Sequence, residues 1–219
     1  MSRAQRARVR RGIRIDTLAK IVVALSILVA VGGVVRLRGA IVHPAVVPLN
    51  VLSVFRPSGW MGDGADTVRH VIAWIDTPSA DCAGCVKVVY TPEAHPSAHS
   101  RGWAGMCLQW PDSNWGRFPG KDLRAYRRLS FSARADSLGA VIFGAGGLDN
   151  AHSSDKLPYR DTFQAAIGPV LVSPEWKHFT IELAGNDLRN VDCGFSWSAA
   201  QASNAHGVTF YLKDIEYGQ

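Results

Sequence analysis

The chain lacks the short signatures that accompany the common catalytic folds. It has no G-x-S-x-G, no H-E-x-x-H, no phosphate-binding loop and no G-x-G-x-x-G, so no local motif supports hydrolase, metallopeptidase or nucleotide chemistry. A glycosidase-like carboxylate pair cannot be singled out either, because Asp149, Asp155, Asp161 and Glu175 are loop residues without a distinguishing neighbourhood. We therefore expect a protein that binds rather than one that catalyses.

Charge is also scarce, and it is unevenly placed. Charged residues make up 19% of the 219 residues and apolar residues 47%, a balance that excludes a disordered chain. The first 39 residues carry nine Lys or Arg and one acid, whereas the remainder carries 15 bases and 17 acids. A nucleic-acid-binding domain would need its bases on the folded part, so we expect no nucleic-acid partner.

One uncharged apolar segment stands near the N-terminus. Residues 21–35 read IVVALSILVAVGGVV between Lys20 and Arg36. The flanking bases can extend towards the headgroups, and apolar neighbours lengthen the segment towards the roughly 20 residues that span a bilayer. Arginines follow where a signal-peptidase site would need small residues, which disfavours cleavage. The excess of bases before the segment predicts a single-pass inner-membrane anchor with a cytoplasmic N-terminus and an extracytoplasmic domain.

These patterns divide the chain into four parts. We expect a basic cytoplasmic tail at 1–17, a transmembrane helix at 18–38, an apolar linker containing several prolines at 39–59 and a folded domain at 60–219. The linker is either extended chain that joins the edge of the domain or a strip that lies on the membrane or on a partner subunit.

The predicted domain consists of short strands separated by turn residues. β-branched and aromatic residues dominate these runs, and several alternate strictly; in HFTIEL, for example, Phe179, Ile181 and Leu183 share one face. The pattern is typical of a β-sandwich or jelly roll. The expected strands cover residues 68–75, 86–90, 102–110, 128–134, 140–143, 178–183, 194–197 and 208–212.

The four cysteines fall into two groups. Cys82 and Cys85 form CAGC directly before an expected strand, which favours a small-loop disulfide over redox chemistry at a helix start. Cys107 and Cys193 stand in strand-like segments and could form a second bridge across the sandwich, although the spacing does not determine the pairing. His95 and His99 follow the CAGC segment, but Pro96 between them disfavours a zinc-finger helix.

Three segments in order carry a resemblance to a known family. DLRAYRRLSFSARAD at 122–136, EWKHFTIELAGNDLRNVDCGFSW at 175–197 and GVTFYLKDIEY at 207–217 resemble the galactose-binding-like β-sandwiches of carbohydrate-binding modules. The resemblance covers most of residues 60–219 and rests mainly on core and turn positions. It implies an all-β jelly-roll sandwich and, as one function, glycan binding at the cell envelope.

The resemblance also implies a structural calcium ion where the first and last strands meet. The matching oxygen ligands in this chain would be Asp63 or Asp66, together with Asp214 or Glu216. Ordinary turn aspartates are the alternative interpretation. No other cofactor is expected.

A loop rich in tryptophan is the candidate sugar site. Within GWAGMCLQWPDSNWGRFPG, we expect Trp103 and Trp110 in the core and Trp115 as the best candidate for an exposed ring. Aromatic faces stack on sugar rings, and polar side chains bind the hydroxyl groups. The residues of this predicted site are Trp115, Phe118, Asp112, Asn114 and Arg117.

Two functions remain open at this point. The anchor, the apolar linker and the nearly neutral domain favour an accessory subunit that docks on a larger integral-membrane complex. The alternative is a carbohydrate-binding module that acts at the cell envelope.

Overall fold

A computed structural model describes residues 45–62, 72–76, 82, 84–92, 102–148 and 157–219. The chain separates into two compact units, Met1–Ala45 and Val46–Gln219, and the description below concerns the second. The predicted tail and transmembrane helix lie outside the described residues. Within those residues, no helix is long and apolar enough to cross a membrane, so the anchor at 18–38 stays a prediction.

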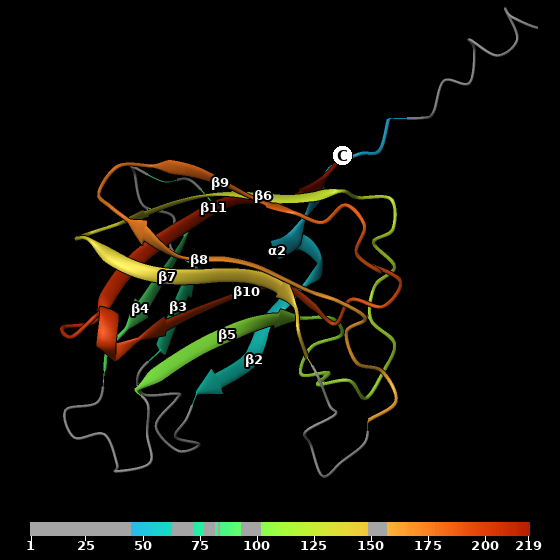
Figure 1. Cartoon of the computed structure of the whole chain (residues 1–219), viewed down its shortest axis with the longest axis horizontal. Helices are drawn as coiled ribbons and strands as arrows, with labels where there is room; N and C mark the ends of the chain where they lie inside the picture. The colour runs from blue at the N-terminus through green and yellow to red at the C-terminus, as the bar shows by residue number, and fades with distance from the viewer. Residues whose placement is uncertain (1–44, 63–71, 77–81, 83, 93–101, 149–156) are drawn as a thin grey trace, which may run out of the picture. The chain divides into compact units, whose positions relative to one another are not determined.

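The described unit is a sandwich of two antiparallel β-sheets. Sheet A has the strand order β3-β4-β11-β6-β9, with β1 paired to β11, and sheet B has the order β2-β5-β10-β7-β8. Figure 1 shows β7, β10, β5 and β2 side by side in one layer, with β6, β9 and β11 in the other. The elements are β1 Leu49–Asn50, α2 Val51–Val54, β2 Arg56–Gly62, β3 Ile72–Asp76, β4 Val86–Tyr90, β5 Trp103–Gln109, β6 Arg128–Ala135, β7 Gly139–Gly146, β8 Gln164–Val172, β9 Lys177–Glu182, β10 Cys193–Ala200, the 3-10 helix η2 Gln201–Ser203 and β11 Val208–Gly218.

The sandwich begins before the predicted boundary at residue 60. Residues 49–59, predicted as linker, instead form β1, α2 and the start of β2. Val51 and Phe55 are fully buried, and a Cβ on Gly194 would lie 2.6 Å from the Phe55 ring. The apolar residues of this segment therefore belong to the core, which explains their hydrophobicity without a membrane surface or a partner.

Most of the predicted strands match observed ones, and β8 was missed. Pairing of β4, β5, β6, β7, β9, β10 and β11 confirms the all-β sandwich. The β8 sequence QAAIGPVLV contains Gly168 and Pro169, two residues that are depleted in strands. Because β8 is an edge strand of sheet B, a proline can be accommodated there without removing an interior ladder hydrogen bond.

The core lies between the two sheets and follows the alternation of the strands. In β6, Leu129, Phe131, Ala133 and Ala135 are buried while the residues between them are not. Phe131 of sheet A packs with its ring centre 4.7 Å from that of Phe143 in sheet B. The two inner faces are thus filled by side chains and leave no room for a ligand between the sheets.

Candidate functional site

The outer face of sheet B is hollowed because small residues occupy its middle strands. One cross-strand row runs from Met61 in β2 through Gly105 and Ser198 to Ile142 in β7. Since successive residues of a strand alternate between the two faces of the sheet, these four positions lie on the face that is turned away from the core. The small residues at the centre and the larger ones at both ends make a depression that runs across the strands.

A second row continues the same floor one step along the strands. It contains Ser196 of β10, Gly144 of β7 and Ala166 of β8. With the exception of Gly105, the residues of both rows line a groove of about 190 Å³ on the outer face. Its rim is made by the larger side chains of Met61, Trp103, Ile142, Leu148 and Gln164.

Two glycines of these rows, Gly144 in the floor and Gly105 beside it, cannot be enlarged without cost. A Cβ on Gly105 would lie 2.4 Å from the carbonyl oxygen of Trp197. A Cβ on Gly144 would lie 3.0 Å from the carbonyl oxygen of Ala165 and 3.1 Å from Ser196 Oγ. The close approach of neighbouring backbone therefore keeps the floor low and leaves the groove open.

The groove combines apolar surface with neutral polar groups. None of the described residues that line it is charged at neutral pH; Ser196, Ser198 and Gln164 supply hydroxyl and amide groups. Trp103 and Ile142 supply apolar surface at the rim, and Ile142 is 40% exposed. Chemically, such a surface suits an uncharged ligand with apolar faces and hydroxyl groups.

A disulfide bridge joins two strands at one end of the groove. Cys107 of β5 and Cys193 of β10 are bonded, with their Cα atoms 5.6 Å apart, and Cys193 also lines the groove. The predicted pair is therefore present, but it links neighbouring strands of one sheet and does not cross the sandwich. Both residues are buried, because the polypeptide after β5 covers this end of the sheet.

That covering loop, residues 110–120, is held from within by Asn114. The Asn114 amide nitrogen donates to the carbonyl oxygens of Trp110 and Phe118 at 3.0 and 2.8 Å, and its oxygen accepts from the Phe118 amide at 2.7 Å. Ser113 and Trp115 have φ angles of 55° and 52°, a region that residues other than glycine seldom adopt. The three side-chain hydrogen bonds of Asn114 therefore stabilise a turn whose positive φ angles are unfavourable for the backbone alone.

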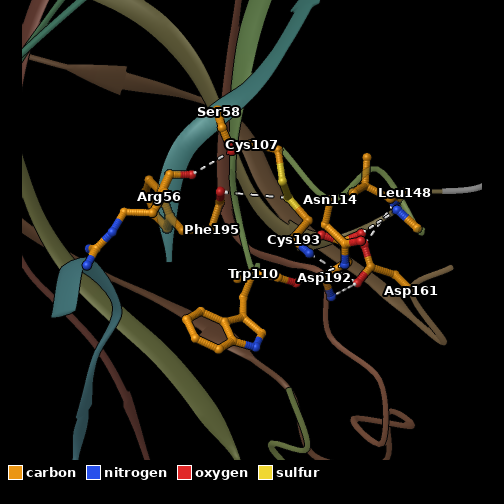
Figure 2. The surroundings of a disulfide bond; sticks show 12 residues. Arg56, Ser58, Cys107, Trp110, Asn114, Leu148, Asp161, Asp192, Cys193 and Phe195 are labelled. Carbon is orange, nitrogen blue, oxygen red and sulfur yellow. Dashed lines mark hydrogen bonds between the residues drawn. A yellow bond between two sulfur atoms is a disulfide. The ribbon is translucent and has the colours of Figure 1, made fainter. Parts of the chain in front are cut away.

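Two buried carboxyl groups, which we name the carboxyl clamp, connect this loop to the groove. Asp161 accepts hydrogen bonds from the amides of Asp192 at 2.6 Å, Cys193 at 3.2 Å and Leu148 at 2.9 Å. Asp192 Oδ2 accepts from the Gly116 amide at 2.7 Å. Figure 2 shows both carboxyl groups beside the disulfide, with Asn114 and Leu148 around them. The clamp therefore ties together the 110–120 loop, the end of β7 and the start of β10.

Burial makes both carboxyl groups of the clamp weaker acids than an exposed aspartate. Burial raises the pKa of Asp161 to about 6, against the lowering effect of its three backbone hydrogen bonds. Burial and, less strongly, the charge of Asp161 raise the pKa of Asp192 to about 7. Among the described contacts, Asp192 Oδ1 is buried and has no hydrogen-bond partner. The clamp is thus sensitive to protonation near neutral pH.

The predicted sugar residues of the 110–120 loop do not line the groove. Asn114 is only 1% exposed and is occupied within the loop. Asp112 and Arg117 are exposed, and Trp115 is half-buried. Phe118 is 59% exposed and is the freer of the two rings, although Trp115 was the predicted one. The loop site stays a prediction, separate from the groove.

The predicted metal ligands are only partly within the described residues. Asp63 and Asp66 lie outside them. Asp214 is exposed at an irregularity of β11 with a φ of 54°, and Glu216 is half-buried. Among the described residues, no group of three or more His, Cys, Asp and Glu side chains is placed to hold a metal ion. The calcium site therefore stays a prediction.

The CAGC segment forms the expected small-loop disulfide. Cys82 and Cys85 are bonded, directly before β4, so their sulfurs are not available as zinc ligands. The histidines that follow, His95 and His99, lie outside the described residues.

Two features of the site escaped the sequence analysis. Trp103 was expected in the core, yet it faces the groove; the alternation of Ala104, Met106 and Leu108, which are all buried, could have assigned it to the outer face. The carboxyl clamp left no such signal, because Asp161 and Asp192 are 31 residues apart in the chain. Only the folding of three separate loops brings these groups together.

Comparison with known proteins gives a likeness in structure alone. No family model matches the chain. No curated protein matches it either. Among solved structures, a family 30 carbohydrate-binding module has 18% sequence identity and a TM-score of 0.50, over 79% of this chain and 88% of that chain. The family 30 carbohydrate-binding module of a cellulosomal cellulase of Clostridium thermocellum has 18% identity and a TM-score of 0.50, over 80% and 98%. The chain therefore has the β-sandwich fold of carbohydrate-binding modules.

Proposed function

We propose that the protein is a non-catalytic glycan-binding protein and that its binding site is the groove on the outer face of sheet B. The observation that carries the proposal is the combination in one hollow of a low floor, an indole at the rim and neutral hydrogen-bonding groups. The C–H face of a sugar ring stacks on an aromatic face, while serine and glutamine side chains bind hydroxyl groups. Because the described lining has no charged side chain, the ligand is a neutral glycan.

The size of the groove favours a chain over an isolated small molecule. Its volume of about 190 Å³ is below the roughly 300 Å³ at which enclosed small-molecule pockets begin. A ligand would thus lie across the strands, with one side in contact with the groove and the other exposed to solvent. A segment of polysaccharide can bind in this way. The rows of floor residues cross β5, β10, β7 and β8 in turn, which supports such a path.

The likeness in fold supports this proposal over the accessory-subunit prediction. The two solved structures of similar fold are described as carbohydrate-binding modules. Fold alone does not fix function, so the groove and not the likeness is the argument for the site. The membrane anchor and the extracytoplasmic location stay predictions beside it.

The proposal is tested by binding of the full-length protein to an array of neutral polysaccharides, followed by affinity measurement on the best ligand. Trp103→Ala is expected to weaken binding at least tenfold, because an aromatic contact carries much of the energy of such a site. Ala166→Leu, at an exposed floor position, is expected to weaken binding by filling the groove without disturbing the core.

The matched control is Phe118→Ala, which removes an exposed ring from the predicted loop site instead. Unchanged affinity in Phe118→Ala, beside the loss in Trp103→Ala, is the expected result. The opposite pattern would move the site to the 110–120 loop, and an array with no binding to any neutral glycan would refute the proposal.

A further inference from the structure

The outer face of sheet A, on the far side of the sandwich from the groove, gathers three cations around two aromatic rings. Tyr211 of β11 lies between Lys87 of β4 and Arg134 of β6 in the strand register. The Arg134 guanidinium carbon is 4.3 Å from the centre of the Tyr211 ring, and the Lys87 ammonium is 6.0 Å from it. Both basic groups therefore lie within the range of a cation–π contact with one ring.

A second ring extends the arrangement. Trp176, directly before β9, has the Lys213 ammonium 4.6 Å from its ring centre and the Arg134 guanidinium carbon 5.5 Å away. Arg134 is thus shared by the two rings. We name the surface formed by Lys87, Arg134, Lys213, Tyr211 and Trp176 the cationic face.

The three cations are held by rings and not by carboxylates. Asp136 accepts a hydrogen bond from the Tyr211 hydroxyl at 3.4 Å, and the exposed Asp214 follows Lys213 in the chain. In the part of the chain that the structure describes, however, neither these nor other acids form an ion pair with Lys87, Arg134 or Lys213. Like charges gathered within about a Debye length repel one another, and an anionic ligand would relieve that repulsion.

A cation that is stacked on a ring keeps N–H donors available for a ligand. A guanidinium that lies over a ring uses its face, while its N–H donors point outward in its own plane. Those donors fit the two oxygens of a carboxylate or sulfate group. Beside the cations, the outward positions of β6 and β9 carry Ser130, Ser132 and Thr180, whose hydroxyl groups can bind sugar hydroxyls. His178 lies opposite Ser132, and Arg128 and Glu182 pair at the far end of these strands.

We propose that the cationic face is a second binding site and that its ligand is an acidic polysaccharide, a glycan bearing carboxylate or sulfate groups. A membrane surface fits less well. Among the described side chains, the exposed large apolar ones lie elsewhere, at Val47, Phe118, Leu138, Ile142, Tyr159 and Leu171, so β4, β6, β9 and β11 offer no such side chain for insertion between lipids. The proposal does not depend on the groove.

The experiment compares the binding of the full-length protein, in neutral detergent, to immobilised dextran sulfate and to dextran, two polymers that share one backbone and differ in sulfate. Polygalacturonate tests carboxylate in the same way. We expect binding to both acidic polymers, little binding to dextran at this face, and a loss of affinity as salt is raised. The double variant Arg134→Gln/Lys213→Gln is expected to weaken binding about tenfold.

The matched control is Lys121→Gln. Lys121 also stacks on an indole, 3.8 Å from the ring centre of Trp110, but belongs to the 110–120 loop region and not to the cationic face. An equal loss of affinity in this variant would show that binding depends only on the net charge of the protein, and it would overturn the proposal. Unchanged binding in the double variant would also overturn it.

Further outcomes separate this site from the groove and from lipid. Trp103→Ala is expected to leave dextran sulfate binding unchanged, so failure of one site is distinguishable from failure of the other. Binding to vesicles rich in anionic phospholipid, without binding to either acidic polymer, would show that the ligand is a membrane surface and not a glycan. This result would overturn the proposal. Thermal melting of each variant confirms that it is folded.

Discussion

The carboxyl clamp predicts that the protein is more stable in mild acid than at slightly alkaline pH. A carboxyl group whose pKa is higher in the folded than in the unfolded chain binds its proton more tightly when folded. Its stabilising effect is complete below the unfolded pKa and is lost as the pH rises through the folded value. For Asp161 and Asp192 the rise is from 3.8 to about 6 and about 7, so the loss falls between about pH 4 and pH 8.

The magnitude at Asp161 follows from its pKa. The rise from 3.8 to about 6 corresponds to about 3 kcal/mol of unfolding free energy, lost when the group ionises. Asp192→Asn removes one of the two acids while keeping an oxygen that can accept from the Gly116 amide. We expect this variant to exceed the wild type in unfolding free energy at about pH 8 by on the order of 2 kcal/mol, with some of the effect screened by solvent. At about pH 5 we expect less than half of this difference, because Asp192 is then ionised in the unfolded chain but not yet in the folded one.

The assay is denaturant unfolding of the full-length protein with its disulfides intact, at a series of pH values, with wild type and variant compared at each. Taking the difference cancels the contribution of histidines that both proteins share. Asp122→Asn is the control, because the hydrogen bond from Arg124 lowers the pKa of Asp122 to about 2 and leaves it ionised throughout the window. If Asp192→Asn and wild type ran parallel from about pH 5 to pH 8, the assignment of the clamp would be refuted.

Other predictions concern the parts of the fold around the groove. Removing the bridge with Cys107→Ala/Cys193→Ala should lower the unfolding free energy by about 2 to 5 kcal/mol, because it closes a loop of sequence separation 86; denaturant unfolding measures this, and a loss under 1 kcal/mol would contradict it. Asn114→Ala should cost about 2 to 4 kcal/mol, since three hydrogen bonds are lost at a buried site; unchanged stability would show that the 110–120 loop does not depend on this side chain. Tyr217→Phe removes the hydroxyl that donates to the Gly194 carbonyl oxygen at 2.6 Å and should cost about 1 to 2 kcal/mol without changing glycan affinity; equal unfolding midpoints would contradict it.

The two outer faces of the sandwich differ in the chemistry they offer. The groove on sheet B is neutral and hollowed by small residues, whereas the cationic face on sheet A carries three stacked bases. Because the sheets pack back to back, ligands on these faces do not compete for space. A protein with both sites could bind a neutral and an acidic glycan at once, which links the two proposals in function while their tests remain separate.

Several elements followed from the sequence because the signal was local. The VKVVY and RLSFSARA segments alternate buried and less buried residues as strands of a half-buried sheet should, and both are strands in the structure. The CAGC disulfide followed from a spacing of three residues. The segment at 49–59 was misjudged because the prolines of residues 39–59 suggested a linker, while its burial depends on β11 and on Gly194 elsewhere in the chain.

The sequence by itself determined the fold class and most of the sheet-forming segments, since periodicity and composition act within each strand. Tertiary structure alone decided which outward residues share a face. Trp103, Ser198 and Ile142 meet only because β5, β10 and β7 pair in one register, and Asp161 meets Asp192 only because separate loops converge. Strand register and the convergence of loops are set by packing between segments that are distant in the chain. The residue pattern within one segment therefore cannot predict them.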